Sequence, residues 1–271
     1  MTVTVMDGPP RNTYLAGVAA GAARDYMAEV AEGNIPGRSI MSAIGARPIM
    51  GTTATGEDLW PGTATTIPLP ASAGEQLSVV STDVQDTATA GTGARRLRVH
   101  YLDSAGDAQV TTVDLDGTTP VDLLPTHVRY VNDVYAVLSG TNGVAEGNIT
   151  VYRKTDATRI YNMIALGGNK SLVPNRMVPL GHTLILAGWH AAEAKNKLCD
   201  IKLRSTDMYG DLWPAAFCFK DVVSLQKQAS GWLPRRVKIP ALSVIKVSAW
   251  PTEDEGSASC SWEGVLIEDG S

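Results

Sequence analysis

The sequence lacks the features that mark membrane proteins and small disulfide-bonded proteins. None of its apolar runs approaches the roughly 18 residues that a membrane-spanning helix needs. Residues 1–7 lack the basic and apolar stretches of a secretory signal, so we expect none. The cysteines Cys199, Cys218 and Cys260 form no C-x-x-C pair, which favours buried thiols in a protein made in a reducing cytoplasm. A single Cys199–Cys260 bridge stays open, because both residues fall on the apolar face of predicted strands.

Catalytic and metal-binding motifs are also lacking. The four histidines never pair at i+2 or i+4, and no G-x-S-x-G elbow or G-K-[ST] loop occurs. Several aspartates gather around a predicted hairpin, where Asp is a favoured turn residue, rather than in a calcium-loop pattern. These are Asp103, Asp107, Asp114 and Asp116. The sequence therefore predicts no enzyme activity, no cofactor and no metal site.

Charge of one sign does not dominate the chain. Lys and Arg number 23 against 28 Asp and Glu, which gives a net charge of -5. A mildly acidic chain has no global field that attracts nucleic acid or anionic lipid. The basic clusters at residues 95–98 and 235–238 alternate with apolar residues, without interleaved aromatics that could stack on bases. We expect no nucleic-acid or membrane partner, while a contact with an acidic partner protein stays open.

Strand patterns recur along most of the chain. Residues 96–101 alternate, with Leu97, Val99 and Tyr101 on one face, and a turn at 103–107 leads to a return strand at 108–115. Spacing of about 8–12 residues between strands and turns is typical of antiparallel sandwiches. The other predicted strands are 77–81, 128–138, 148–152, 159–164, 183–188, 197–204, 213–220, 237–239, 243–250 and 258–267.

The chain divides into three predicted parts. Residues 1–57 contain a small-residue helix near 12–32, with Asn12 or Thr13 as N-cap and Gly33 after its end. About 25 residues of weak periodicity follow, which we interpret as an extended arm lying over another surface. Residues 58–155 and 156–271 are strand-rich. The predicted fold is all-β: two antiparallel, jelly-roll-like β-sandwich domains preceded by a helix and an arm. Jelly-roll and immunoglobulin-like strand orders both stay open.

Several short strings resemble virion structural proteins of tailed bacteriophages. The strings at 91–95 (GTGAR) and 114–121 (DLDGTTPV) are similar to a "GTGAR" loop and an "LNGTTPV" strand end in that group. Residues 58–62 (DLWPG) resemble the group's Trp–Pro/Gly segment, and 34–39 (NIPGRS) resemble its "IPGHS" segment, with Arg38 in place of His. The end of the chain, 263–269, is similar to its G-x-L-x-E-D ending. The resemblance implies a particle component without catalytic residues.

Together these features predict a capsid-associated cement, decoration or vertex protein that acts by protein–protein contacts. Its partners would be major capsid or tail/neck proteins, and it would form a homo-oligomer, with a trimer favoured. It would be made in the host bacterial cytoplasm and reside in the virion. The arm would dock on another virion protein and become ordered there. Its predicted docking residues are Ile35, Pro36, Arg38, Ile40 and Arg47.

Two other functions stay open. One is a tail, neck or fibre-base component, which would differ in copy number and symmetry. The other is a carbohydrate-binding module for host recognition, in which Trp189 or Trp232 stacks on sugars.

Overall fold

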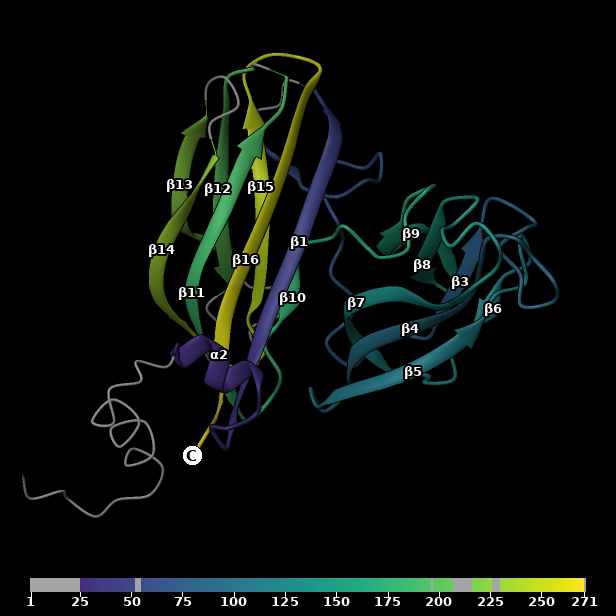
Figure 1. Cartoon of the computed structure of the whole chain (residues 1–271), viewed down its shortest axis with the longest axis horizontal. Coiled ribbons are helices and arrows are strands. Elements are labelled where there is room, and N and C mark those ends of the chain that lie inside the picture. Colours follow the sequence, from purple (N-terminus) through teal and green to yellow (C-terminus); the bar gives the residue numbers. More distant parts are fainter. Residues whose placement is uncertain (1–24, 52–54, 196, 207–215, 226–229, 271) are drawn as a thin grey trace, which may run out of the picture.

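The computed structural model describes residues 25–51, 55–195, 197–206, 216–225 and 230–270. The described chain is nearly all β, as predicted, and its sheets are antiparallel. Its strands form two units that lie side by side in Figure 1. We call residues 25–59 and 174–270 the larger unit, and residues 75–170 the smaller unit.

The larger unit contains two sheets that share one hydrophobic core. The first has the order β1 (Arg38–Met50), β16 (Gly256–Glu268), β11 (His182–Glu193), β14 (Ser230–Ile239). The second has the order β10 (Arg176–Met177), β15 (Val244–Pro251), β12 (Cys199–Thr206), β13 (Phe217–Leu225), and the short β2 (Glu57–Asp58) also pairs with β15. Apolar side chains of both sheets meet in the core, among them Leu184, Trp189, Trp262, Ile201 and Val247.

The pairings of the larger unit follow a nested pattern. With β2 left aside, its strands in chain order are β1, β10, β11, β12, β13, β14, β15 and β16. The first pairs with the last, the second with the seventh, the third with the sixth and the fourth with the fifth. This is the pattern of one long antiparallel ribbon folded over itself. Pairing of β11 with β16 and of β12 with β15 then joins the ribbon's parts into the two sheets.

The smaller unit lies between the first and second strands of that ribbon. One of its sheets has the order β6 (Val121–Asp122), β3 (Leu77–Ser81), β8 (Ile149–Arg153), β9 (Asp156–Ile164). The other has the order β5 (Ala108–Asp114), β4 (Ala94–Asp103), β7 (Val128–Ser139). In β4, Leu97 and Val99 are buried and Arg98 is exposed, so the predicted alternation is confirmed.

The unit boundaries differ from those predicted. The cut at residues 155 and 156 falls inside a hairpin, because β9 pairs with β8 in the smaller unit. Residues 38–50 are not an unpaired arm but strand β1, which pairs with β16 along its length. The alternation of β1 is weak in sequence because its core-facing positions include small residues such as Ala43 and Gly45. Gly45 is required there, since a Cβ would lie 2.4 Å from Cδ of Pro174.

The helix prediction is confirmed at its C-terminal end. Within the described residues the helix is α2 (Tyr26–Ala31), and the side chain of its N-cap Asp25 accepts a hydrogen bond from the Met27 amide at 2.9 Å. Gly33 follows with a φ of 76°, as predicted from its position after the helix. The predicted N-cap at Asn12 or Thr13 lies outside the described residues.

The GTGAR and DGTTPV strings form one loop cluster around Asp86. The buried Asp86 carboxylate accepts hydrogen bonds from the amides of Ala94 and Gly147 at 2.8 and 2.9 Å, and from Ser81 Oγ at 2.6 Å. A Cβ on Gly93 would lie 2.2 Å from Asp86 Oδ1. The amide of Gly117 donates to the Asp86 carbonyl at 2.8 Å. These strings therefore hold the smaller unit together, which explains their glycines.

Asp86→Ala should destabilise the smaller unit strongly. The substitution leaves buried backbone amides without an acceptor, and such losses typically cost about 3 kcal/mol or more in total. Asp83→Ala is the matched control, because the Asp83 side chain accepts a bond from the exposed Gln85 amide at 2.8 Å. Urea unfolding should show an early transition in the first variant and a near wild-type curve in the second. Equal curves would contradict a central role for Asp86.

Candidate docking site

The predicted docking residues occupy the start of β1 and the turn before it. Pro36 is exposed, Ile35 and Ile40 are partly buried, and the Arg38 guanidinium lies 5.8 Å from the ring centre of Tyr26 on α2. Arg38 also donates a hydrogen bond to the Tyr26 hydroxyl. Ile35 and Pro36 therefore lie in the turn before β1 and Arg38 and Ile40 on the strand itself, all four at least partly exposed. Their docking role stays a prediction.

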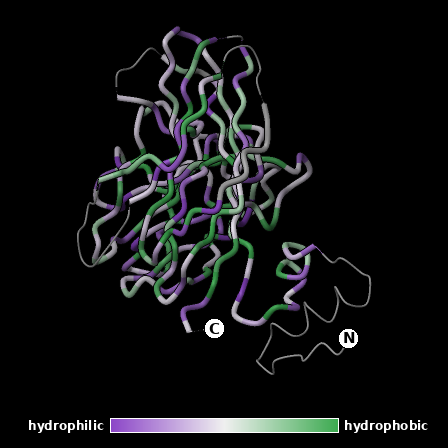
Figure 2. The backbone as a smooth tube through the Cα atoms, turned by 90° about the vertical axis from the view of Figure 1, so that its left-hand side faces the viewer, coloured by the Kyte–Doolittle hydropathy of each residue, from purple (hydrophilic) through white to green (hydrophobic). Residues whose placement is uncertain are grey.

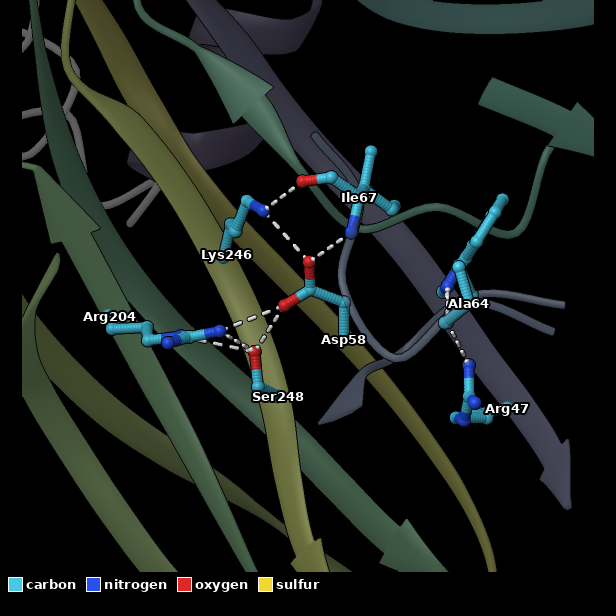
Figure 3. Close-up of polar contacts among 8 residues, drawn as sticks. Arg47, Asp58, Ala64, Ile67, Arg204, Lys246 and Ser248 are labelled. Atoms are coloured by element: carbon cyan, nitrogen blue, oxygen red, sulfur yellow. Dashed lines mark hydrogen bonds and ion pairs between the residues drawn. The ribbon is translucent and has the colours of Figure 1, made fainter. Parts of the chain in front are cut away.

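Arg47, the fifth predicted docking residue, is used inside the chain. Its side chain is only 6% exposed and pairs with Glu57. It also donates to the carbonyl oxygens of Gly62 and Ala64, each at 3.0 Å. Figure 3 shows its contact with the segment after β2. Arg47 anchors that segment to β1, so this residue is a structural contact and not a docking residue.

A second buried charge lies on the same segment. Asp58 is fully buried, and its carboxylate is 2.8 Å from Lys246 Nζ and 2.9 Å from an Arg204 guanidinium nitrogen. It also accepts hydrogen bonds from Ser248 Oγ at 2.7 Å and from the Ile67 amide at 2.8 Å. Figure 3 shows Arg204 of β12 and Lys246 and Ser248 of β15 converging on this carboxylate. Asp58 thus ties the segment leading to the smaller unit onto the outer face of the second sheet.

The surroundings of Asp58 keep its carboxylate ionised. Burial alone would raise the pKa of Asp58, but the charge and hydrogen bond of Lys246, the Ile67 amide and the charge of Arg204 outweigh burial. The pKa of Asp58 therefore lies below its ordinary value. Burial is also the main influence on Lys246 and lowers the pKa of that ammonium group, while Asp58 opposes the shift.

Direct contacts hold the two units together. The Asn132 side chain on β7 accepts from the Met177 amide at 2.7 Å and donates to the Met177 carbonyl at 3.0 Å. Leu102 and Tyr130 of the smaller unit pack with Met177 and Val244 of the larger unit in a small hydrophobic cluster. The predicted hairpin turn at 103–107 also touches the larger unit, because the Gly106 carbonyl accepts from the Leu180 amide at 2.9 Å.

A cleft lies between the units beside this junction. One cavity of about 320 Å³ is lined by Ile40 and Ser42 of β1 and by His100, Asp133 and Arg176. An adjoining cavity of about 490 Å³ shares His100, Asp133 and Lys170 and adds Tyr135. We call both together the inter-unit cleft. Clefts of this size between domains are common binding sites.

The inter-unit cleft has a surplus of positive charge. Asp133 is 2.9 Å from Lys170 Nζ and 3.5 Å from an Arg176 guanidinium nitrogen, so one carboxylate faces two cations. His100 Nε2 is 3.2 Å from the Tyr135 hydroxyl. Burial lowers the pKa of His100, and the nearby charge of Arg98 acts in the same direction, whereas Asp133 opposes it. This favours a neutral His100 beside the cations.

The sequence missed both of these features. Asp58 stands in the DLWPG string, which carried a resemblance but no sign of a buried ion pair. His100, Asp133 and Lys170 are far apart in the chain, and only the pairing of β4 with β7 and the turn after β9 bring them together. No spacing rule could have grouped them.

Other candidate residues have structural positions. All three cysteines are free thiols, so Cys199 and Cys260 are not bridged, and burial raises the pKa of Cys199 to about 12. Trp189 is fully buried and its indole N–H donates to Asp221 at 2.8 Å, which removes it as a sugar-stacking residue. The side chain of Trp232 lies outside the described part of the chain. The described residues contain no group of three or more His, Cys, Asp or Glu side chains placed to hold a metal ion. None of the helices in the described part has the length and apolar character needed to cross a bilayer.

Comparisons with known proteins give little. No protein-family model and no curated protein matches the chain. Among solved structures, the infectious bursal disease virus Gx strain matches with 11% identity and a TM-score of 0.26, over 86% of this chain and 73% of that chain. The T13 particle of the same virus matches with 9% identity and a TM-score of 0.25, over 85% and 70%. TM-scores this low do not establish a shared fold.

Asp58→Asn should destabilise the larger unit at neutral pH. The substitution leaves Lys246 buried without its counter-charge, and breaking a buried pair costs about 3 kcal/mol or more. Because the folded pKa of Asp58 is lowered, the stability from this carboxylate is present above the unfolded pKa of about 4 and is lost as pH falls through the folded value. The gap between wild type and variant should therefore narrow below about pH 4.

Thermal unfolding from pH 7 to pH 3 measures this gap. Asp114→Asn is the control, since Asp114 pairs with Arg96 at the surface, where the two side chains are 51% and 46% exposed. The control should track the wild type at neutral pH. A constant gap between Asp58→Asn and wild type across the whole range would show that the charge of Asp58 does not stabilise the fold.

Proposed function

We propose that this chain is a structural protein of a virus particle, and specifically a capsid-associated cement, decoration or vertex protein of a tailed bacteriophage. It acts through protein–protein contacts and not as an enzyme. The observation that carries the proposal is the nested ribbon of the larger unit, with a second β unit inserted into its first connection.

The ribbon supports a jelly-roll assignment for the larger unit. A jelly roll is an antiparallel ribbon wound into two sheets, and the four nested pairs are the pairs that such winding requires. Double-sheet jelly rolls serve in viral capsids, in lectins and in cupins. The inserted smaller unit, whose two sheets share their own core, is a second sandwich that extends from the first. This architecture suits a protein with one part held in a lattice and another projecting.

The site chemistry favours the particle role over the other uses of the fold. A cupin-type metal site needs a cluster of ligating side chains, and the described residues supply none. A lectin needs accessible aromatics, and Trp189, one of the two candidate tryptophans, is buried. The strings that resemble phage virion proteins lie in the smaller unit, at β2 and the segment after it, and at the ends of β1 and β16, which supports a common framework for both units.

A particle protein of this kind acts as an oligomer, and we propose a homotrimer. Closed symmetry repeats each contact, and a specific contact buries about 1,600 Å². Major capsid or tail/neck proteins of the virion are its partners.

The direct test is the amount and location of the chain in purified particles. Quantitative mass spectrometry against the major shell protein, combined with labelled-antibody imaging, should find this chain spread over the shell in numbers comparable to the shell protein. A few copies at one vertex or along the tail would overturn the cement assignment in favour of a neck or tail component. Absence from particles would overturn the particle role altogether.

A further inference from the structure

The backbone of β1 has a defined orientation towards the inter-unit cleft. On one side of β1 the Gly37 carbonyl accepts from the Glu268 amide at 2.8 Å. On the opposite side the Ala46 amide donates to the Leu172 carbonyl at 3.2 Å. Since backbone groups alternate along a strand, Ile40, Ser42 and Ile44 direct their amide and carbonyl groups away from β16, as Ala46 does. The register of β1 with β16 is regular over these positions.

That side of β1 forms an open strand edge within the described residues. β16 is the strand that pairs with β1 there, and the segment around Leu172 covers the edge at Ala46. Ile40, Met41 and Ser42 line the cavity of about 320 Å³. An edge with unpaired donors and acceptors is a template for an added strand, and proteins use such edges to bind extended segments.

The opposite wall of the inter-unit cleft carries a surplus of positive charge. Lys170 and Arg176 face the single carboxylate of Asp133, and the Lys170 side chain is 43% exposed. A bound segment with an acidic side chain would offset this surplus. The cleft therefore fits an extended segment with good strand propensity and a carboxylate.

The chain itself contains a segment with this chemistry. Residues 2–6 read Thr-Val-Thr-Val-Met, in which the first four residues are β-branched, and Asp7 follows. These residues lie outside the described part of the chain. The described chain begins at Asp25 beside α2, and α2 contacts the start of β1 through Tyr26 and Arg38. The residues between Asp7 and Asp25 span up to about 60 Å when extended, which is ample reach for a neighbouring molecule.

We propose that residues 2–7 of a neighbouring copy add as a strand to the open edge of β1, with Asp7 directed at Lys170. Exchange of this segment links copies of the chain to one another. The choice of a neighbouring copy rests on the proposed function, in which copies of the chain form an oligomer. The cleft and its preference for an acidic strand rest on the geometry alone.

Disulfide trapping in the full-length protein tests the contact. In a Cys218→Ser background, cysteines placed one at a time at residues 2–6 are combined with Ser42→Cys, and air oxidation is followed on non-reducing gels. We expect bands of two or more chains for at least one position. The control combines the same cysteines with Thr158→Cys, an exposed position on β9 away from the cleft, and should give no such bands.

A charge exchange tests the role of Lys170. Asp7→Lys and Lys170→Glu should each weaken self-association about threefold in sedimentation velocity, and the double variant should restore it. Unchanged melting temperatures show that the variants fold.

Each outcome bears on a distinct part of the proposal. A cross-link within one chain would overturn the exchange between copies, and no cross-link at any position would overturn the strand addition. Failure of the double variant to recover would remove the Asp7–Lys170 contact. All of these experiments use the purified protein. The strand addition can therefore fail while the chain is still found in particles, and it can succeed while the chain is absent from particles.

Discussion

The pairing of the first strand with the last organises the larger unit. β1 and β16 are separated by most of the chain, yet their ladder runs from Arg38 with Ile267 to Arg47 with Ala258 and continues to Met50. Closing a loop of this length costs conformational entropy before any contact is gained. The ladder offsets that cost by placing Ala43, Met50 and Trp262 in one core with the second sheet. The other three nested strand pairs are formed by strands that lie between β1 and β16 in the chain.

The smaller unit is inserted between β1 and β10. The segments that lead into it and out of it must therefore lie close together. The outgoing segment is held by Arg47, which pairs with Glu57 and donates to the backbone carbonyls of Gly62 and Ala64. It is also held by Asp58, which pairs with Lys246 and Arg204. The returning segment lies on β1, where Pro174 fits against Gly45 and its carbonyl accepts from the Trp262 indole at 2.8 Å. Both connections are therefore fixed to the same ladder, and Asn132 completes the attachment from the smaller unit. Figure 2 shows short hydrophobic and hydrophilic stretches following one another along the backbone.

Much of this arrangement could be predicted from local sequence patterns. The features that could not be predicted depend on pairing between residues that are far apart in the sequence. Alternation at Leu97 and Val99 and the turn at 103–107 were enough to place β4 and β5. The sequence predicts an arm at residues 38–50, and not a strand, because the inward positions of this strand are small and its hydrophobic periodicity is therefore faint. The predicted boundary after residue 155 is wrong because a tight hairpin and a linker share the same turn residues. Arg47 was predicted to dock on a partner, yet a lone arginine gives no sign that Glu57 and carbonyl oxygens enclose it.

Hydrogen exchange of the β1 amides in the isolated protein reports directly on whether β1 closes the ribbon with β16. If β1 closes the ribbon with β16, the amides of Met41 and Ala43, which point at β16, should exchange as slowly as the core amides of β16. Rapid exchange of these amides, with β11 and β16 still protected, would mean that residues 38–50 are an arm that orders only on a partner. That result would contradict the nested ribbon.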